Sequence, residues 1–381
     1  MRRFLFLALS FVLLASGIVW AQEVSGPVFV SDPVVPTLTP AIRDLPTFVP
    51  DPNLFGLEAK RRDDHGIIVP DIDMPPHRNP LAEMQSKAPG PSPSAFGTPF
   101  VNFAGVTSSS SPPDDTGDVG PNQFLQGDNG PGGSRVTIFS KTGTQQAQFL
   151  METLGSSPCN TGYCDPIVQY DQLADRWMIS EFDSSVDVLC VYVSKTADPL
   201  GQWWAYSFNP DGVDQDYPKY GVWPDGYYIG VNNGGYIHVL DRVKMLSGLA
   251  ATFQSFQITT LSGFGFQLTL PATVEGVAPP VGAPGIFARP VDTEIHTGYS
   301  CTSEPCDVMD LWTVHVDWAT PASSTLTHLA GVKIAEYDHT LCGTGSTWNC
   351  MPQPGTTQKI DPIREPIHFP LQYRNWGGYE T

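Results

Sequence analysis

The sequence lacks the short motifs that mark the best-known catalytic families. It contains no G-x-S-x-G nucleophile turn, no H-E-x-x-H helix, no phosphate-binding glycine loop and no dinucleotide fingerprint. These absences argue against serine hydrolases of the α/β type, zinc proteases and nucleotide-dependent enzymes. The eight histidines are scattered, which also speaks against a compact histidine-rich metal centre.

Basic residues are scarce. Twenty Lys and Arg residues stand against 39 Asp and Glu residues, giving a formal net charge of −19. Such a field repels phosphate backbones, so we expect no nucleic-acid partner. The charge permits calcium or a cationic surface as a partner, although acidity often serves only solubility.

Long hydrophobic runs are also absent after the first twenty residues. The N-terminus begins with Met1-Arg2-Arg3, continues with the apolar run 4–19 and ends with small residues before Gln22. This pattern predicts a secretory signal peptide over residues 1–21. A membrane anchor is the alternative, but the run is shorter than the roughly 20 residues that span a bilayer. We therefore expect a secreted or cell-surface-associated mature chain with no membrane span.

The seven cysteines fit an exported chain. Six fall into close pairs, which predict three local disulfides: Cys159 with Cys164, Cys301 with Cys306, and Cys342 with Cys350. Zinc is the rival interpretation for the two C-x4-C pairs. Cys190 lies inside an apolar run and is expected to be a buried, inert thiol.

Residues 22–99 are rich in proline, which removes backbone donors and favours an extended chain. We expect this segment to be a leader or linker before the folded domain. A part of it, such as residues 54–57, could lie against that domain.

Residues 100–381 predict an all-β fold. Long amphipathic helical patterns are missing, and only residues 241–248 look like a helical turn. Two consecutive units of roughly 45 residues each read as four short strands, the size of one propeller blade. Their strands are expected at 165–170, 176–182, 188–193 and 203–208, and then at 216–223, 227–231, 236–240 and 253–258.

Three further regions carry similar but weaker patterns. We expect a unit over residues 118–154, another over 266–337 and the opening of a further blade at 367–376. The fold prediction is thus a β-propeller of four-stranded blades, with about four to five blades present. Two explanations are open: a small propeller closes with its N-terminal strand, or the chain is a shortened form of a longer one. Closure removes exposed sheet edges, and a chain that ends just after a new blade begins would leave an edge open. We therefore favour the shortened form.

Three segments carry a resemblance to a known group. They are Pro112-Pro-Asp-Asp-Thr-Gly-Asp-Val-Gly-Pro-Asn122, Asp165-Pro-Ile-Val-Gln-Tyr-Asp-Gln-Leu-Ala-Asp-Arg-Trp177 and Asp216-Tyr-Pro-Lys-Tyr-Gly-Val-Trp-Pro-Asp-Gly-Tyr-Tyr228. The chain resembles large secreted bacterial β-propeller proteins that are loosely similar to sialidase-type propellers. The resemblance implies the fold, an extracellular location and longer relatives. It supplies no catalytic set, and the sialidase box Ser-x-Asp-x-Gly-x-x-Trp is missing.

One acidic loop predicts a metal site. Asp114, Asp115 and Asp118 surround a glycine turn, and closely spaced carboxylates are what calcium prefers. The alternative is an Asx-type turn that leads into the first strand. No other cofactor is expected.

Several residues are candidates for ligand binding. Asp165 and Asp216 occupy equivalent places in consecutive units, where a ring of acids could bind a cation or a sugar, or where Asp simply turns the chain. Glu181 shares a strand face with Ile179, which is unusual for an acid. Trp177 and Trp223 could stack on sugar rings or pack between blades.

These residues leave two functions open. The first is an extracellular module that binds a glycan, a protein or the cell envelope. The second is a glycoside hydrolase, which needs two carboxylates about 5 Å or 6.5–9.5 Å apart. Acids close to the predicted blade ends are the candidates: Asp165, Asp171, Glu181, Asp183 and Asp216.

Overall fold

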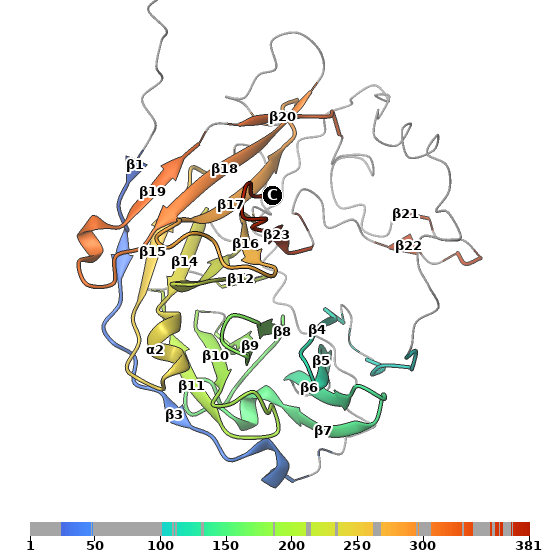
Figure 1. Cartoon of the computed structure of the whole chain (residues 1–381). Coiled ribbons are helices and arrows are strands. Elements are labelled where there is room, and N and C mark those ends of the chain that lie inside the picture. Colours follow the sequence, from blue (N-terminus) through green and yellow to red (C-terminus); the bar gives the residue numbers. More distant parts are fainter. Residues whose placement is uncertain are drawn as a thin grey trace, which may run out of the picture.

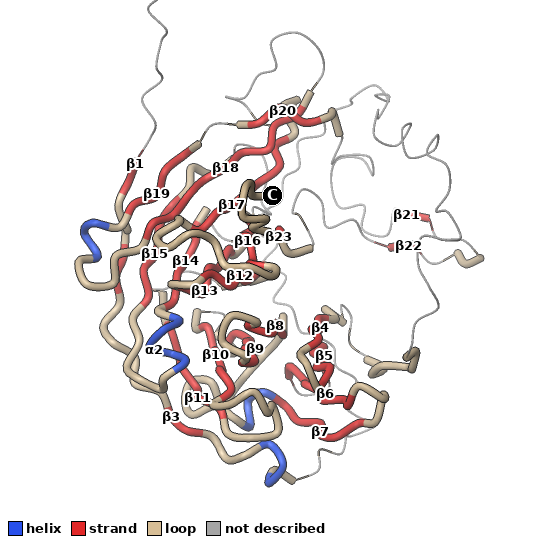
Figure 2. The backbone as a smooth tube through the Cα atoms, viewed as in Figure 1, coloured by secondary structure: helices blue, strands red, loops and turns tan. Residues whose placement is uncertain are grey.

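The computed structural model describes residues 24–46 and 48, and then residues 101–381 apart from short gaps and longer ones at 211–214, 262–267, 297–305, 338–350 and 361–366. Strands dominate this part of the chain (Figures 1 and 2). The α-helix α2 (Arg242–Leu246) is a short turn that begins at the predicted place. The side chain of Asp241 caps it by accepting a hydrogen bond from the backbone N–H of Lys244 at 3.1 Å.

Four antiparallel sheets follow one another along the chain, and each contains four consecutive strands. Blade 1 consists of β4 (Thr116–Val119), β5 (Gln123–Gly130), β6 (Gly133–Ser140) and β7 (Gln145–Leu150). Blade 2 consists of β8 (Ile167–Asp171), β9 (Arg176–Phe182), β10 (Leu189–Ser194) and β11 (Trp203–Phe208).

The next two sheets repeat this order. Blade 3 consists of β12 (Lys219–Trp223), β13 (Gly226–Gly230), β14 (Tyr236–Leu240) and β15 (Phe253–Gln257). Blade 4 consists of β16 (Leu270–Val274), β17 (Gly285–Val291), β18 (Asp307–His315) and β19 (Thr325–His328). Two small strands extend this sheet: β20 (Val332–Ile334) pairs with β18, and β23 (Leu371–Tyr373) lies parallel to β16. A separate hairpin joins β21 (Met351–Pro352) to β22 (Lys359–Ile360).

The blades are arranged as a fan, with the first strand of each blade near the centre and the fourth strand at the periphery (Figure 1). This arrangement confirms the predicted β-propeller. The strands expected in blades 2 and 3 agree with those observed to within a few residues.

Side chains join the inner strands of neighbouring blades. Asp118 on β4 accepts a hydrogen bond from the backbone N–H of Tyr170 on β8 at 2.7 Å. Thr273 on β16 accepts one from the N–H of Val222 on β12 at 3.2 Å. An innermost strand has an unpaired edge, and a buried N–H without a partner is costly. These side-chain oxygens therefore stabilise the inner edges and join the blades.

Blades 2 and 3 pack both of their faces against neighbouring blades. On β9, Trp177 and Ile179 belong to the core between blades 1 and 2, whereas Met178 belongs to the core between blades 2 and 3. A third core lies between blades 3 and 4 and contains Trp223 and Phe287. Because both faces are buried, the middle strands read as continuous apolar runs rather than as alternating patterns.

The first part of the proline-rich segment lies on the propeller instead of leading away from it. Its strands β1 (Val24–Ser25), β2 (Phe29–Val30) and β3 (Thr37–Leu38) pair with β19, β15 and β11, the outer strands of blades 4, 3 and 2. The short 3-10 turn η1 (Ile42–Asp44) follows. We call residues 24–45 the strap. Residues 1–23 and 54–57, with the predicted signal peptide and contact segment, lie outside the described residues.

The disulfide prediction needs correction. Cys159 is bonded to Cys190, 31 residues away, so Cys190 is not a free thiol and Cys159 does not pair with Cys164. Cys190 lies opposite Glu181 on the face of blade 2 that meets blade 1, where the chain carrying Cys159 packs. Cys306 is also disulfide-bonded. The remaining predicted partners, Cys301, Cys342 and Cys350, lie outside the described residues.

No helix in the described part of the chain is both long enough and apolar enough to cross a membrane.

Candidate functional site

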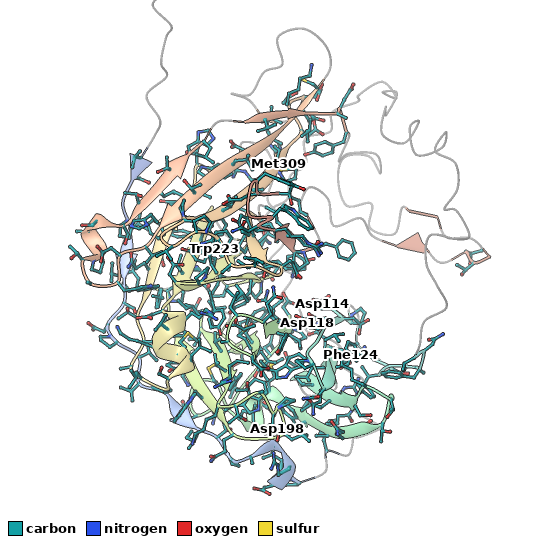
Figure 3. All side chains as sticks on the ribbon, viewed as in Figure 1. Asp114, Asp118, Phe124, Asp198, Trp223 and Met309 are labelled. Carbon is teal, nitrogen blue, oxygen red and sulfur yellow. A yellow bond between two sulfur atoms is a disulfide. The ribbon has the colours of Figure 1, made fainter. Side chains whose placement is uncertain are left out.

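The two tryptophans predicted to bind a ligand lie inside the propeller. The side chains of Trp177 and Trp223 (the latter labelled in Figure 3) are fully buried. The Trp223 ring meets Tyr373 edge-on, with ring centroids 4.8 Å apart. The indole N–H of Trp223 donates to the carbonyl of Ala283 at 2.9 Å. Both rings pack between blades, as the alternative interpretation of these aromatics expects.

Asp165 joins three blades. Its φ of 54° places it in the left-handed region, where the chain turns into β8. Its backbone N–H donates to Oδ1 of Asn129 in blade 1 at 3.1 Å, and its Oδ2 accepts from the N–H of Tyr217, just before blade 3, at 3.1 Å. This buried carboxylate therefore has a clear structural role at the junction of the blades.

Asp216 has a local role at the start of blade 3. Its carboxylate accepts a hydrogen bond from Nδ2 of Asn232 at 2.8 Å, and its carbonyl accepts one from the N–H of the same residue at 2.9 Å. Asp216 thereby holds the turn after β13 against the entry to β12.

The acidic loop predicted to bind calcium is spread out. Besides binding the N–H of Tyr170, Asp118 accepts a hydrogen bond from the N–H of Val119 at 2.7 Å. Burial raises the pKa of Asp115, and the nearby carboxylate of Asp128 raises it further. Asp114, labelled with Asp118 in Figure 3, adopts a φ of 42°. Within the described residues these three carboxylates do not converge on one point.

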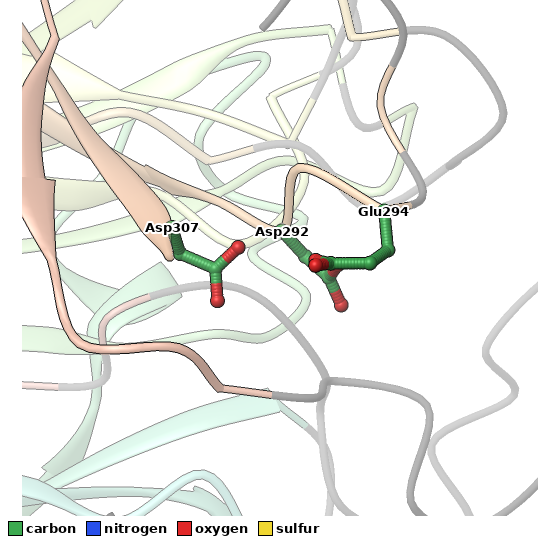
Figure 4. Close-up of side chains that lie close together, drawn as sticks. All are labelled: Asp292, Glu294 and Asp307. Carbon is green, nitrogen blue, oxygen red and sulfur yellow. The ribbon is translucent and has the colours of Figure 1, made fainter. Parts of the chain in front are cut away.

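A different acidic group does converge. Ligand oxygens of Asp292, Glu294 and Asp307 lie within 4.8 Å of one another, and Figure 4 shows the three side chains around a common space. Asp292 and Glu294 follow β17, and Asp307 begins β18. The N–H groups of Thr293 and Tyr337 donate to the two oxygens of Asp307 at 2.8 and 2.6 Å.

The electrostatics of this acidic group favour the binding of a proton or a cation. Burial, together with the carboxylates of Asp307 and Asp292, raises the pKa of Glu294 to about 7. Burial also raises the pKa of Asp307. Chemically the group can offer three hard oxygen ligands, about half of what calcium takes. The sequence gives little warning of it, because Asp307 is distant from Asp292 along the chain.

Glu181 is fully buried, as is Asp171 among the other candidate acids. Its side chain is inaccessible between blades 1 and 2, and the hydroxyl of Tyr192 lies 3.4 Å from its Oε1. Burial raises the pKa of Glu181 well above its usual range, and the carboxylate of Glu152 contributes. A Cβ at Gly162 would lie 2.2 Å from Oε1 of Glu181, so only glycine leaves room for this carboxyl. Glu181 and Ile179 are both fully buried, and so are Met178 and Ser180 on the other face of the same strand.

The remaining acids of the hydrolase hypothesis are also in structural contacts. Asp171 forms a buried ion pair with Arg242. Asp183 accepts hydrogen bonds from the hydroxyl of Ser185 at 2.7 and 2.9 Å and from the N–H of Val188 at 3.1 Å. These contacts fold the loop between β9 and β10.

Among the described residues, the most exposed pair of aromatic rings in contact with each other lies in the C-terminal turn. Trp376 and Tyr379 are 54% and 64% exposed, with centroids 6.2 Å apart and planes inclined by 23°. The indole N–H of Trp376 donates to Oγ1 of Thr381 at 3.1 Å, and its backbone N–H donates to the carbonyl of Tyr379 at 2.9 Å. Gly377 supplies the positive φ of 81° that this turn requires.

Sequence reasoning missed this ring pair. The signal available was the Gly377-Gly378 dipeptide between two aromatic residues, which marks a tight turn presenting both rings. Phe369 is a further exposed ring in the same terminal segment.

No family model matches the chain, and no curated protein matches it either. Among solved structures, it is similar to a GH43 endo-arabinanase from Bacillus licheniformis, with 14% identity, 59% of this chain and 80% of the other covered, and a TM-score of 0.32. It is similar to the native arabinanase from Bacillus subtilis, with 12% identity, coverages of 57% and 93%, and a TM-score of 0.32.

A neuraminidase-like protein of A/flat-faced bat/Peru is also similar, with 11% identity, coverages of 59% and 73%, and a TM-score of 0.28. Similarities this distant add nothing to what the four sheets already establish, and they say nothing about activity.

Proposed function

We propose that this chain is a secreted β-propeller of the bacterial group that its sequence resembles, and that it binds an extracellular glycan without cleaving it. The Cys159–Cys190 disulfide supports an oxidising location, because such bonds persist mainly outside the reducing cytosol. Residues 1–21 would then direct export and be removed.

The observation that carries a binding role is the structural use of the candidate catalytic acids. Asp165 and Asp216 hold the chain where it enters blades 2 and 3. Asp171 forms an ion pair with Arg242, and Asp183 accepts the hydrogen bonds that fold the loop after β9. The side chain of Glu181 is fully buried between two blades. A glycosidase needs two carboxylates that face an accessible sugar. These five acids are engaged in holding the propeller together instead.

The exposed rings of Trp376 and Tyr379 are the surface that would contact the sugar. Aromatic rings supply large apolar faces, and the hydrogen bond from the indole N–H of Trp376 to Thr381 holds its ring in place. Rings already held in place lose little conformational freedom on binding.

A polysaccharide and glycan-array screen of the full mature chain tests this proposal. The screen is run with and without Ca²⁺, because a calcium site at Asp114, Asp115 and Asp118 stays a prediction. We expect saturable binding to at least one glycan class and no release of reducing sugar. Release of reducing sugar would favour the hydrolase, and absence of any glycan binding would refute the proposal.

Two variants test the ring pair. Trp376→Ala and Tyr379→Ala should each weaken glycan binding about tenfold or more, as expected for aromatic residues that anchor an interface. The matched control is Val281→Ala, which removes an exposed apolar side chain elsewhere on blade 4. If all three variants bind equally well, the glycan does not contact these rings.

A further inference from the structure

We propose that the outer edges of blades 2, 3 and 4 form a peptide-binding site, and that its ligand is the strap, residues 24–45 of the same chain. The ligand class is an extended, proline-interrupted peptide with apolar anchors at defined positions. The strap crosses the three edges in succession on the outside of the fan, as the blue segment of Figure 1 shows.

Main-chain pairing provides the common part of the recognition. At blade 3, the N–H of Val28 donates to the carbonyl of Ser255 at 2.8 Å, and the N–H of Ser31 donates to the carbonyl of Phe253 at 3.0 Å. Val34 exchanges two such bonds with Ala251, at 2.8 and 3.0 Å. An added strand on an open edge is a known mode of peptide recognition, in which backbone bonds give affinity.

Blade 2 is contacted in the same way. The N–H of Thr39 donates to the carbonyl of Trp203 at 2.9 Å, and the hydroxyl oxygen of Thr39 accepts from the N–H of Trp203 at 2.9 Å. Further along, the N–H of Ile42 donates to the carbonyl of Gly201 at 3.0 Å.

Three apolar side chains give the strap its register. Ile42 is 3% exposed and belongs to the core between blades 1 and 2. Phe29 packs on Phe253 with ring centroids 5.5 Å apart, and both Phe29 and Val34 contact the core between blades 2 and 3. Between these anchors the strap turns other apolar side chains outward, such as Val35, which is 76% exposed.

Prolines divide the strap into segments. Pro27, Pro33, Pro36 and Pro40 alternate with the paired residues. A proline has no N–H to donate and has a fixed φ, so it limits each edge contact to a short strand. The chain can then bend from one blade to the next. The same prolines keep the outer surface of the strap from becoming a new edge for other chains.

The connection to the rest of the chain is long, because residues 46–115 separate the strap from β4. The strap contacts themselves, rather than the covalent connection, therefore determine whether the strap stays in place. It behaves as a ligand that is attached to its own receptor.

Cleavage of the folded full chain tests this inference. A recognition sequence for a site-specific protease is inserted at residues 89–90, and the purified protein is cut and passed through a size-exclusion column under native conditions. We expect the N-terminal fragment to elute with the propeller and to separate from it only in denaturant. Separation of the fragment under native conditions would overturn the proposal.

Substitutions in the cut protein identify the anchor. Ile42→Asp places a charge in the core between blades 1 and 2 and should release the fragment. Val35→Asp, at an outward-facing position of the same strap, should leave it bound. Equal retention of both variants would refute the anchoring role of Ile42.

A competition experiment does not depend on the folding of any variant. The cut wild-type protein is incubated with excess synthetic peptide of residues 24–46, and displacement of the fragment is followed. The wild-type peptide should displace it, and the peptide carrying Ile42→Asp should be at least tenfold less effective. Displacement by neither peptide, or equally by both, would overturn the proposed site.

Discussion

Asp171 at the end of β8 and Arg242 at the start of α2 form a two-point ion pair that joins blade 2 to blade 3. The guanidinium donates from Nε to Oδ2 at 2.6 Å and from Nη2 to Oδ1 at 2.8 Å. The hydroxyl of Tyr227 donates to the same carboxylate at 2.9 Å. The side chains of Asp171 and Arg242 are only 0% and 6% exposed, so neither has water as an alternative partner.

Removing one partner of this pair should be strongly destabilising. Arg242→Met keeps most of the side-chain volume but leaves the charge of Asp171 buried without its guanidinium. We expect the free energy of unfolding to fall by roughly 3–5 kcal/mol, the usual cost of breaking a buried ion pair. Urea denaturation followed by tryptophan fluorescence measures the change.

The matched control is Arg43→Met at the surface. Arg43 pairs with Asp198 (labelled in Figure 3), but both side chains are about half exposed. A solvent-exposed pair of this kind contributes about 0–1 kcal/mol. Losses of similar size for Arg242→Met and Arg43→Met would contradict the stabilising role of the Asp171–Arg242 pair.

Glu181 should make the protein less stable as pH rises. Its pKa in the folded chain is raised well above the usual 4.5 by burial. Between the two pKa values the folded state binds more protons than the unfolded state, so the free energy of unfolding decreases as pH increases through that window. Glu181→Gln keeps the shape without the charge and should abolish this decrease.

The comparison is made by urea denaturation at pH 4 and pH 8. The two proteins should be about equally stable at pH 4, and the variant should be more stable by about 1 kcal/mol or more at pH 8. Asp44→Asn, at an exposed position of the strap, serves as the control. A Glu181→Gln protein that loses stability with pH as steeply as the wild type would contradict this assignment.

Local patterns made blades 2 and 3 predictable. Their strands are apolar runs bounded by turn residues. The apolar run and the turn residues lie within a few positions of each other, so local sequence is enough to locate each strand. The units predicted over residues 118–154 and 266–337 did not locate the inner strands β4 and β16, which are short and poor in large apolar residues. The contacts that hold these strands come from a neighbouring blade: Thr273 on β16 accepts a hydrogen bond from the N–H of Val222 on β12. Such contacts cannot be read from local sequence.

Burial on both faces also bears on the candidate site. Trp177 and Trp223 were predicted either to stack on sugar rings or to pack between blades, and neighbouring blades cover both rings. The disulfide prediction was wrong for a related reason. Spacing favoured Cys164 as the partner of Cys159, whereas the packing of blade 2 against blade 1 brings Cys190 next to it. Proline content predicted an extended leader or linker over residues 22–99, whereas residues 24–45 lie along the outer edges of blades 2, 3 and 4.

His238 should make the protein sensitive to acid. Burial lowers its pKa to about 3 from the usual 6.5, and its Nδ1 lies 2.8 Å from the hydroxyl of Ser255. As pH falls from 6.5 toward 3, the unfolded chain binds the proton first, so the free energy of unfolding decreases by about 1 kcal/mol per pH unit. This contribution to stability is complete only above pH 6.5.

His238→Asn should reduce that acid sensitivity. The measurement is the difference in unfolding free energy between pH 7 and pH 4.5 for each protein, because any cavity cost is the same at both values and cancels. His315→Gln, on an exposed part of β18, is the control and should keep the wild-type difference. An unchanged difference in the His238→Asn protein would show that another group carries the acid sensitivity.

The Cys159–Cys190 bond gives the last prediction. Peptide mapping without reduction should recover a cross-link between the peptides that carry these two residues. Cys190→Ala should lower the free energy of unfolding by roughly 2–4 kcal/mol, because the bond closes a loop across two strands of blade 2 and the core it shares with blade 1. Cys164→Ala should cost clearly less, since it leaves that bond intact. The opposite result would be a larger loss of stability for Cys164→Ala and a peptide map with Cys159 joined to Cys164. That result would contradict the Cys159–Cys190 bond and support the pairing predicted from spacing.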